Sequence, residues 1–515
     1  MQLEEFLNRQ KEFALGHLPT EGFHPETRNL SELVNEDLAA AIRIVQSIDL
    51  AAMDKTEAKS ERIQLLSGII QKTFSKGHRV FLSGCGATGR LALALESTWR
   101  KTHAGTEREN SVQALMAGGD FALVKSVENF EDFPDYGRRH LRDLGFTAGD
   151  LLIAITEGGE TPYVIGTVHE ALAHAKENIF QKPWFVYCNP TELLCKTVER
   201  SRAVIENPDV ENLCIETGPM ALSGSTRLQA ATVQMLAVGS ALWNDLSLIS
   251  RLKTGYSLFN LSGFLKPVVE WESGVYQDKN FVMYQTDDFP IAVLTDTTER
   301  SPTFSLTPFE KQRDFHPSHY SLCYLCIPSV EDSESSWVEI LNRQPIGLEW
   351  EELNGRLGRE SILEFDFSGK FVNARALKLF PCEQKTIELN RSENRLEFFT
   401  DQFSSVAESD LLSHPLLAQL LVKMILNTHS LMVMGMIGRY EGNVMTWVRS
   451  SNGKLIDRTL RYLDFLIEKR QLPNPGREKL LEMMFQEMTT IGPNDAMVLK
   501  ILEKLTVNSH DAKSN

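Results

Sequence analysis

The sequence is poor in cysteine, in positive charge and in long apolar runs, and each shortage excludes a class of protein. Its 515 residues include only 7 cysteines, without regular spacing, which argues against a disulfide framework and indicates a reducing compartment. The 69 acidic and 53 basic residues give a net charge of −16, which would repel nucleic acids and anionic membranes. No apolar run reaches the length of a membrane span and the N-terminus lacks a signal-peptide pattern, so we expect a cytoplasmic protein.

One cysteine pair, Cys323 and Cys326, has the CxxC spacing of metal and redox sites. It lies in an alternating run that predicts a strand, on which residues three apart point to opposite faces. We therefore interpret both cysteines as buried strand residues, and we expect neither a metal nor a cofactor in this protein.

Apolar periodicity divides the chain into four parts. In residues 1–77 apolar positions recur three and four apart, which predicts a helical segment. In 78–265 short apolar runs alternate with amphipathic stretches of helix length, which predicts a parallel sheet covered on both faces. Residues 266–440 form a second, less regular α/β block. Residues 441–515 are predicted to be helical, with a polar tail that we expect to be disordered from Asn508.

The strands of each α/β block are predicted from these apolar runs. In the first block they are residues 79–83, 112–116, 151–156, 184–187 and 203–205. In the second block they are residues 289–294, 321–327 and 386–399. Each block closes with an amphipathic helix, over 227–248 and 414–437. Two tandem copies of one domain would explain why this pattern occurs twice. The chain is long enough for more than one hydrophobic core.

The sharpest local signal is the strand-to-helix loop Gly84-Cys-Gly86-Ala-Thr88-Gly89-Arg90. Such a turn presents backbone amides and the Thr88 hydroxyl at a helix N-terminus, where the helix dipole favours a negative charge. The G-x-G-x-x-G spacing also occurs in dinucleotide folds, but the acidic residue that such a site needs after the next strand is absent. A phosphate or sugar site is the main interpretation, and a tight turn without a ligand is the alternative.

Two further loops follow strands of the same block. The loop 156–162 carries two glutamates, which would repel a phosphate unless they face away or bind a sugar hydroxyl. The loop 218–227 holds more hydroxyl groups than an ordinary helix N-cap needs. Open α/β sheets bind ligands at the loops after their strands, so three such loops together predict a site for an anionic sugar.

With these loops placed, the chain resembles the SIS-domain family, named for sugar isomerases, that contains the N-acetylmuramic acid 6-phosphate etherases and the glucokinase regulatory protein. The resemblance covers nearly the whole chain. Its motifs are Asn35-Glu-Asp-Leu, Gly84-Cys-Gly-Ala-Thr-Gly-Arg-Leu, Ala117-Gly-Gly-Asp, Val127-Glu-Asn-Phe-Glu131-Asp132, Glu160-Thr-Pro-Tyr, Ser223-Gly-Ser-Thr-Arg-Leu, Lys423-Met-Ile-Leu-Asn and Ser451-Asn-Gly-Lys454-Leu. In the etherases the last two follow the first α/β block directly. The intervening second block here is similar to the layout of the regulatory protein.

The resemblance implies two tandem SIS domains, with parallel sheets flanked by helices, N-terminal helices and a C-terminal helical lid. It implies a phosphorylated hexose or amino sugar as ligand, a sugar kinase as candidate partner, and a monomer, because the second domain replaces a partner subunit. At Glu160 the family has serine, and Gln229 replaces a family arginine or lysine. With the loops, it predicts a binding site made of Gly86, Thr88, Gly89, Glu131, Thr156, Glu160, Ser223, Ser225, Thr226 and Lys454.

The catalytic residues of the etherases are matched unevenly. Their chemistry uses two glutamates, of which the base matches Glu131 and the acid matches Thr98. A threonine hydroxyl is too weak an acid for that role, and Glu96 would point to the opposite side of the helix. We therefore expect a sugar-phosphate sensor of the regulatory type. The alternatives are an etherase, which is a carbon–oxygen lyase and would use Glu131, and a sugar-phosphate isomerase.

Overall fold

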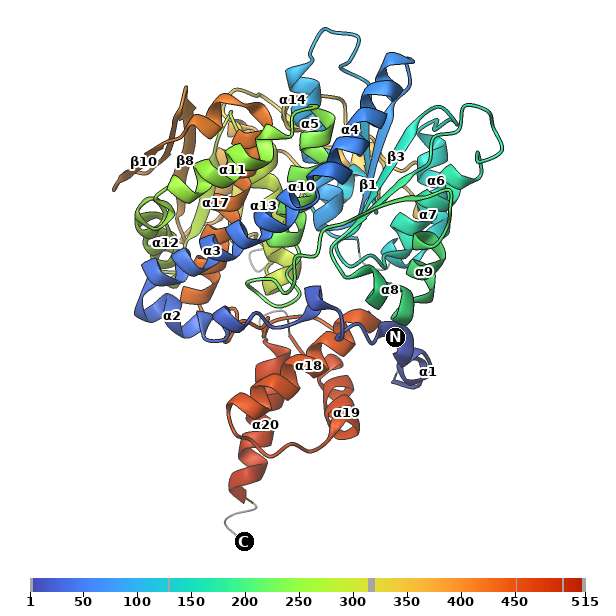
Figure 1. Cartoon of the computed structure of the whole chain (residues 1–515). Coiled ribbons are helices and arrows are strands. Elements are labelled where there is room, and N and C mark those ends of the chain that lie inside the picture. The colour runs from blue at the N-terminus through green and yellow to red at the C-terminus, as the bar shows by residue number, and fades with distance from the viewer. Residues whose placement is uncertain (1–2, 128–129, 314–319, 451, 493–494, 512–515) are drawn as a thin grey trace.

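The first α/β block contains a five-stranded sheet whose neighbouring strands all run parallel, in the order β2-β1-β3-β4-β5. The computed structural model describes residues 3–127, 130–313, 320–450, 452–492 and 495–511 (Figure 1). The strands of this sheet are β1 (Val80–Gly84), β2 (Val112–Met116), β3 (Leu151–Ile155), β4 (Trp184–Tyr187) and β5 (Glu211–Cys214).

Helices cover both faces of this sheet, which explains why its central strands are apolar throughout. All five residues of β1 and of β3 are buried. Helix α5 packs against β1 and β2, α7 packs against β3, and α10 packs against α4 and α5. The helices of this block are α5 (Ala87–Thr102), α6 (Pro134–Asp143), α7 (Pro162–Leu172), α8 (Thr191–Thr197), α9 (Glu199–Ile205) and α10 (Gln229–Leu242).

The second α/β block holds a separate five-stranded sheet in the order β10-β9-β8-β6-β7. Strand β6 pairs in parallel with β7 and β8, whereas β8, β9 and β10 pair antiparallel. The expected α/β class with two sheets is confirmed, with the difference that the second sheet is mixed. Its strands are β6 (Phe281–Gln285), β7 (Cys323–Cys326), β8 (Gln384–Ser392), β9 (Arg395–Phe399) and β10 (Ser404–Glu408).

Two predicted strands are wrong, and both are helical. Residues 203–205 belong to α9, and the fifth strand is instead β5, of which only Leu213 is buried. Residues 289–294 begin helix α13 (Pro290–Phe304), and the strand that precedes it is β6. A short apolar run suits a buried helix as well as a strand, so the pattern alone could not separate them. The strand prediction for Cys323 and Cys326 is confirmed, and both are buried.

Helices from several parts of the chain surround the second sheet. The N-terminal helix α3 packs against α10, α11 and α12, and α17 packs against α12 and α13. The N-terminal helices are α1 (Leu3–Phe13), α2 (Leu30–Glu36), α3 (Leu38–Glu57) and α4 (Ser60–Ser75). Those after the first sheet are α11 (Ser247–Leu258), α12 (Leu261–Gln277), α14 (Ser333–Leu341), α15 (Arg359–Leu363), α16 (Gly369–Lys378) and α17 (Pro415–Met436). Short 3₁₀ helices lie at Pro19–Glu21, Pro25–Thr27, Asp120–Leu123, Phe130–Asp132, Glu351–Leu353 and Asp410–Ser413.

The C-terminal helices form a separate layer below the two sheets, beside the N-terminal helix α1 (Figure 1). They are α18 (Gly453–Lys469), α19 (Arg477–Met488) and α20 (Met497–Asp511). The prediction of disorder from Asn508 is wrong as far as residue 511, because α20 continues to Asp511. Some residues named in the sequence analysis lie outside the described part of the chain. They are residues 512–515 of the tail, Asn494 of the predicted C-terminal helices, and the motif residues Glu128, Asn129 and Ser451.

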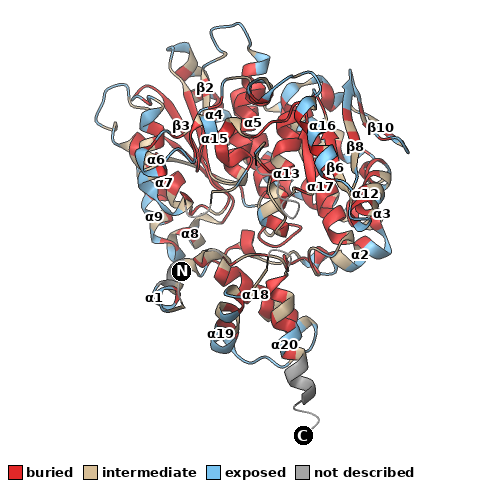
Figure 2. Cartoon of the chain, turned by 180° about the vertical axis from the view of Figure 1, so that it is seen from behind, coloured by how far each residue is buried: buried red, intermediate tan, exposed pale blue. Residues whose placement is uncertain are grey.

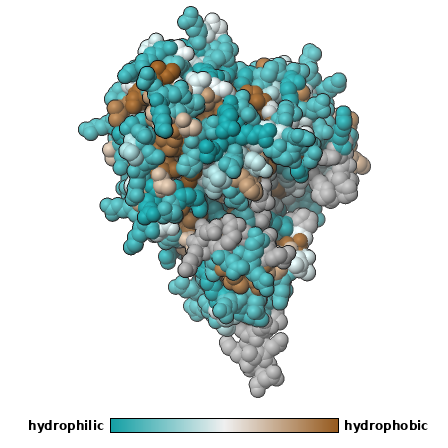
Figure 3. All heavy atoms as spheres, turned by 90° about the vertical axis from the view of Figure 1, so that its right-hand side faces the viewer, coloured by the Kyte–Doolittle hydropathy of each residue, from teal (hydrophilic) through white to brown (hydrophobic). Residues whose placement is uncertain are grey.

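Burial is concentrated in the strands and in the helices between the two sheets, especially α5, α13 and α17 (Figure 2). Of the described helices, α17 alone is long and apolar enough to cross a membrane by length and composition, and 89% of its apolar window is buried within the protein. It is therefore a core helix of this fold. The face drawn in Figure 3 is mostly hydrophilic, with apolar side chains in small groups.

Candidate functional site

A cavity of about 670 Å³ lies where the three loops of the first sheet meet the second block and the lid. Its lining comes from the loops after β1, β2, β3 and β5, from the end of α13, and from the start of α18. This is the edge at which the parallel strands end, where open α/β sheets bind ligands. The volume is in the usual range for a small-molecule site.

The loop after β1 folds as a tight turn that only glycine permits. Gly86 has φ of +54° and lines the cavity. A Cβ at Gly84 would lie 2.4 Å from the carbonyl carbon of Thr88. The Thr88 hydroxyl closes the turn, because it accepts from the Cys85 amide at 3.0 Å and lies 2.9 Å from the Cys85 carbonyl oxygen. Thr88 is fully buried and does not line the cavity.

The loop after β3 presents its two glutamates and Thr161 to the cavity, but not Thr156. The Thr156 hydroxyl lies 3.0 Å from that of Thr161 and accepts from the Gly159 amide at 3.3 Å. Glu157 and Glu160 both line the cavity. Oε1 of Glu157 is buried and has no hydrogen-bond partner, and burial raises the pKa of this carboxyl to about 7. The side chain of Thr156 is used within its own loop, and its neighbour Glu157 lines the cavity.

The loop after β5 contributes hydroxyl groups directly before α10. Ser225 and Thr226 line the cavity, and Oγ of Ser225 is buried without a hydrogen-bond partner. Ser223 turns away, since its hydroxyl donates to the Glu21 carbonyl oxygen at 3.3 Å. The hydroxyl group of Ser223 therefore makes a structural contact, whereas those of Ser225 and Thr226 lie at the cavity.

Helix α18 brings Lys454 and Arg458 to the cavity from the lid. Nζ of Lys454 lies 2.8 Å from Oε1 of Glu160 and 3.9 Å from Oε1 of Glu21. Burial lowers the pKa of Lys454, but Glu160 and Glu21 outweigh it and the pKa lies above its usual value. The guanidinium of Arg458 donates to both carboxylate oxygens of Glu21, at 2.6 and 3.0 Å. The lid is thus fastened to the body by ion pairs at the cavity wall.

Glu131 lines the cavity from the 3₁₀ helix Phe130–Asp132. Its Oε2 accepts from the Cys85 thiol at 3.3 Å. Burial raises the pKa of this thiol well above its usual value, and the Glu131 carboxylate adds to the shift. Cys85 is therefore a neutral hydrogen-bond donor and not a reactive thiolate.

Neither Thr98 nor Glu96 lines the cavity. The Thr98 hydroxyl donates to the Ala94 carbonyl oxygen at 2.7 Å within α5. Glu96 pairs with Arg100 and with Arg343 of the second block, each at 3.0 Å. Position 98 lies ten residues beyond Thr88, which is about 15 Å along a helix. Helix α5 therefore supplies no acidic side chain to this cavity.

The predicted site residues divide into two groups by their position. Six of them line the cavity: Gly86, Glu131, Glu160, Ser225, Thr226 and Lys454. Four do not line it: Thr88, Gly89, Thr156 and Ser223. The three hydroxyl groups of the second set are used within the fold, and a Cβ at Gly89 would lie 2.5 Å from Cβ of Met116, so this glycine permits the close packing of α5 on β2.

Several lining residues were not predicted from the sequence. They include Glu21, Arg90, Glu157, Arg227, Glu299 and Arg458. Among the described residues, four polar atoms of the lining side chains are buried without a hydrogen-bond partner: Arg90 Nε, Glu157 Oε1, Ser225 Oγ and Arg227 Nε. Arg90 belongs to the glycine-rich loop and Arg227 to the loop 218–227, so their place in these motifs could have identified them as site residues. Glu21 and Glu299 come from segments that are distant in the sequence from these motifs and carry no local signal of their own.

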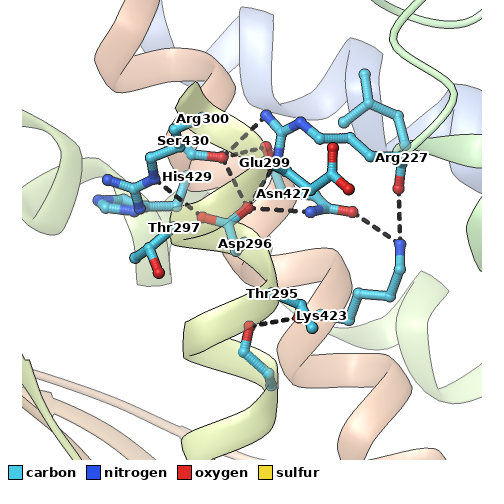
Figure 4. A network of polar contacts seen from close by, with 12 residues as sticks. Arg227, Thr295, Asp296, Thr297, Glu299, Arg300, Lys423, Asn427, His429 and Ser430 are labelled. Atoms are coloured by element: carbon cyan, nitrogen blue, oxygen red, sulfur yellow. Dashed lines mark hydrogen bonds and ion pairs between the residues drawn. The ribbon is translucent and has the colours of Figure 1, made fainter. Parts of the chain in front are cut away.

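A network of buried charges supports the wall of the cavity behind Arg227 (Figure 4). Arg227 pairs with Asp296 at 2.7 Å, and Arg300 pairs with Asp296 at 3.0 Å and with Glu272 at 2.7 Å. Nζ of Lys423 donates to the Arg227 carbonyl oxygen at 2.9 Å. The network joins α10 of the first block to α12, α13 and α17, so it holds the loop before α10 in a fixed position relative to the second block.

Comparisons with known proteins agree with this arrangement. The glucokinase regulatory protein N-terminal SIS domain family matches residues 61–172. An N-acetylmuramic acid 6-phosphate etherase from Lactococcus lactis subsp. cremoris is 33% identical over 273 residues, which cover 53% of this chain and 82% of that protein. The corresponding etherase from Psychromonas ingrahamii is 32% identical over 238 residues, which cover 46% of this chain and 69% of that protein.

A solved structure, the C-terminal domain of glucosamine-fructose-6-phosphate aminotransferase from Francisella tularensis, is 10% identical with a TM-score of 0.32. It covers 75% of this chain and 96% of that chain, and a likeness at this level supports no functional argument. The etherase relatives and the domain match are the informative results. They agree with the first α/β block and its glycine-rich loop, and this chain belongs to the SIS-domain family of N-acetylmuramic acid 6-phosphate etherases and glucokinase regulatory protein.

Proposed function

We propose that this protein binds a phosphorylated hexose or amino sugar in the 670 Å³ cavity and acts as a sensor of the glucokinase-regulatory type. The observation that supports this most strongly is the set of four buried, unpartnered polar atoms on the cavity wall. Buried polar groups in folded proteins are nearly always hydrogen-bonded, so four in one cavity indicate a polar ligand that completes them.

The wall offers suitable groups for a phosphate. The turn at Gly86 and the start of α10 at Ser225 and Thr226 provide amides and hydroxyls at helix N-termini, which favour anions. Arg90 and Arg227 each have an Nε–H without a partner, and guanidinium groups form strong hydrogen bonds with phosphate oxygens.

The position of the lid supports the proposal of a sensor. Lys454 and Arg458 on α18 line the same cavity as the loops of the first sheet, so one ligand would contact both parts. A ligand shifts the position of a lid only through a difference in its contacts with the two positions, and Lys454 provides such a contact.

A sugar kinase is the partner class that completes this proposal. Kinase assays with and without this protein, at several sugar-phosphate concentrations, test that part. A cytoplasmic location and a monomeric state remain predictions.

An etherase is the second candidate, because the cavity wall carries two carboxyl groups outside the ion pairs of Glu21, Glu160 and Glu299. Glu131 and Glu157 both line the cavity, and the relatives named above are N-acetylmuramic acid 6-phosphate etherases. Elimination of an ether needs one acid and one base, which two carboxyl groups can supply. This reaction releases D-lactate, whereas a sugar-phosphate isomerase would release a product sugar and a sensor would only bind.

A thermal-shift screen across hexose and amino-sugar phosphates tests the proposal. A ligand present at 100 times its dissociation constant stabilises a protein by about 2.7 kcal/mol, which a melting curve detects. The matched neutral sugars serve as controls. The absence of any shift with millimolar sugar phosphates would contradict the proposed function.

A further inference from the structure

Glu157 stands out among the residues of the cavity because its carboxyl group is buried and incompletely bonded. It follows β3 directly, and it is 9% exposed. Its backbone oxygen accepts from the Cys188 amide at 3.0 Å, so the loop itself is well fixed. Oε1 has no hydrogen-bond partner. The side chain is therefore held at the cavity wall with one carboxyl oxygen that has no partner in the protein.

The surroundings of Glu157 favour its neutral form. The pKa of this carboxyl is raised to about 7, chiefly by burial and also by the charges of Glu299 and Glu160, while the hydrogen bond from its own amide and the charge of Lys454 oppose the shift. The thiols of Cys85 and Cys188 also face it, and burial keeps the pKa of both well above the usual value. The titratable groups around Glu157, from every element packed on it, are Glu160, Glu299, Lys454, Cys85 and Cys188.

The charge balance of the cavity depends on this one carboxyl group. The glutamates of the wall are Glu21, Glu131, Glu157, Glu160 and Glu299. The cationic residues are Arg90, Lys125, Arg227, Arg449, Lys454 and Arg458. With Glu157 neutral, six positive charges face four negative ones, and the excess of two matches a phosphate dianion. With Glu157 ionised, the excess falls to one and a further carboxylate repels the ligand.

We propose that Glu157 meets the bound sugar phosphate as a neutral carboxylic acid and donates its proton in a hydrogen bond to an oxygen of the ligand. This rests on the proposed function. A carboxylate can only accept hydrogen bonds, whereas the acid has one O–H to donate. When the ligand arrives as a dianion above pH 7, one proton passes from solvent to Glu157, and no covalent bond of the sugar changes. Binding of the sugar phosphate is therefore coupled to proton uptake.

Isothermal titration calorimetry with fructose 6-phosphate at pH 8, in two buffers of different ionisation enthalpy, tests the proposal on the unmodified protein. We expect uptake of close to one proton, since most of Glu157 is ionised in the free protein at this pH. We also expect the affinity to fall by about tenfold for each pH unit above 7. Binding without proton uptake at pH 8 would overturn the proposal.

The variant Glu157→Gln isolates the role of this residue, because glutamine keeps a donor that cannot be lost as the pH rises. We expect Glu157→Gln to bind fructose 6-phosphate with nearly constant affinity from pH 7 to 9 and without proton uptake. Glu192→Gln, at an exposed position on α8, is the matched control and should behave as wild type. A pH profile of Glu157→Gln that parallels the wild type would contradict the assignment. If this variant does not fold, the number of protons that the wild type takes up on binding still tests the proposal.

The two proposals fail in different ways in these experiments. If the wild type binds no sugar phosphate at any pH, the proposed function fails. If it binds fructose 6-phosphate, but with the same proton count and pH profile as Glu157→Gln, the proposed function stands and the role of Glu157 is wrong.

Discussion

Nζ of Lys454 at the start of α18 lies 2.8 Å from Oε1 of Glu160 in the loop after β3. The lid and the first sheet are thus joined by a contact at the cavity itself. The resemblance to the family predicts a serine at this position, where this chain has Glu160 and forms the ion pair. A phosphate bound nearby has to compete with Glu160 for the same ammonium group.

Glu160→Ser should therefore strengthen the binding of sugar phosphates. Removing the carboxylate frees the ammonium of Lys454 and removes one repulsive charge from the wall. A hydrogen bond to a charged group contributes about 1.5–3 kcal/mol, so we expect an increase in affinity of about tenfold or more. Calorimetry with fructose 6-phosphate and with fructose compares the charged and the neutral ligand.

The control for this prediction is Lys454→Met, alone and combined with Glu160→Ser. Lys454→Met should weaken binding of fructose 6-phosphate and hardly alter binding of fructose. In the double variant the gain from Glu160→Ser should disappear, because the ammonium that it frees is absent. An equal gain with and without Lys454 would show that the lysine does not contact the phosphate.

The Glu21 carboxylate should make the lid sensitive to acid. Burial raises the pKa of Glu21, but Arg458, Lys454 and Arg461 outweigh it and lower the pKa to about 2. A carboxyl group whose pKa is lower in the folded state stabilises the fold above its unfolded pKa and loses this effect as the pH falls towards the folded pKa. The window here runs from about pH 4.5 down to about pH 2, and the stabilisation at stake is on the order of 3 kcal/mol.

Thermal unfolding of the wild type and of Glu21→Gln between pH 7 and pH 3 measures this effect. The variant should be less stable at pH 7, because Arg458 and Arg461 lose a charged partner. The difference between the two melting temperatures should shrink below pH 4.5, because Glu21 becomes protonated in the unfolded wild type while it stays ionised in the folded protein until about pH 2. A difference that stays constant down to pH 3 would contradict the assignment.

The elements that the sequence predicted correctly are those with a strong local pattern. The strands β1 to β4 are mostly apolar, and all their residues are buried except Gln113. Strand β5 is an edge strand with one buried residue, Leu213, so its apolar signal is weak and the nearby run 203–205 in α9 was chosen instead. A helix that is buried all round, such as the start of α13, has no amphipathic period and was taken for a strand.

The candidate site was predictable as a set of loops and less so as a set of side chains. Glycine and hydroxyl patterns identified the turns at Gly86 and Ser225, because such turns have local requirements. Whether Thr156 or Glu157 faces the cavity depends on one peptide unit within the loop, which the pattern does not determine. Glu299 reaches the cavity only through the packing of α13 against α5, a contact between distant segments.

Asp296 should be essential for stability, because it lies between two buried guanidinium groups. It is 3% exposed and pairs with Arg227 and with Arg300. Removing one partner of a buried ion pair leaves an uncompensated charge, which costs about 3–5 kcal/mol. Asp296→Ala should lower the melting temperature strongly and also weaken sugar-phosphate binding, since Arg227 lines the cavity.

The control is Glu339→Ala, which removes a surface ion pair with Lys101 across 3.4 Å. Exposed pairs of this kind contribute less than about 1 kcal/mol, so its melting temperature should stay near that of the wild type. Denaturant unfolding of both variants measures the two effects. Equal and small losses would show that the network shown in Figure 4 is not a determinant of stability.

Turnover of N-acetylmuramic acid 6-phosphate should be absent or slow. The family acid is matched by Thr98, which donates to the Ala94 carbonyl oxygen outside the cavity, so α5 supplies no acid to this site. General acid catalysis typically contributes about 10²–10⁴-fold, and D-lactate release should be lower by that order than in a relative with both glutamates. An enzymatic D-lactate assay of the wild type, Glu131→Gln and Thr98→Glu measures this. We expect Thr98→Glu to restore nothing, because position 98 does not face the cavity.

The outcome that would contradict the sensor is D-lactate release at ordinary enzyme rates that Glu131→Gln abolishes. The acid would then have to be another carboxyl group of the cavity, and Glu157 is the one whose pKa of about 7 suits a proton donor near neutral pH. In that case Glu157→Gln should also abolish turnover while sugar-phosphate binding persists, because glutamine can donate a hydrogen bond but cannot give up a proton. Loss of turnover in both variants, with binding retained, would make this chain a lyase that takes its acid from the loop after β3 and not from α5.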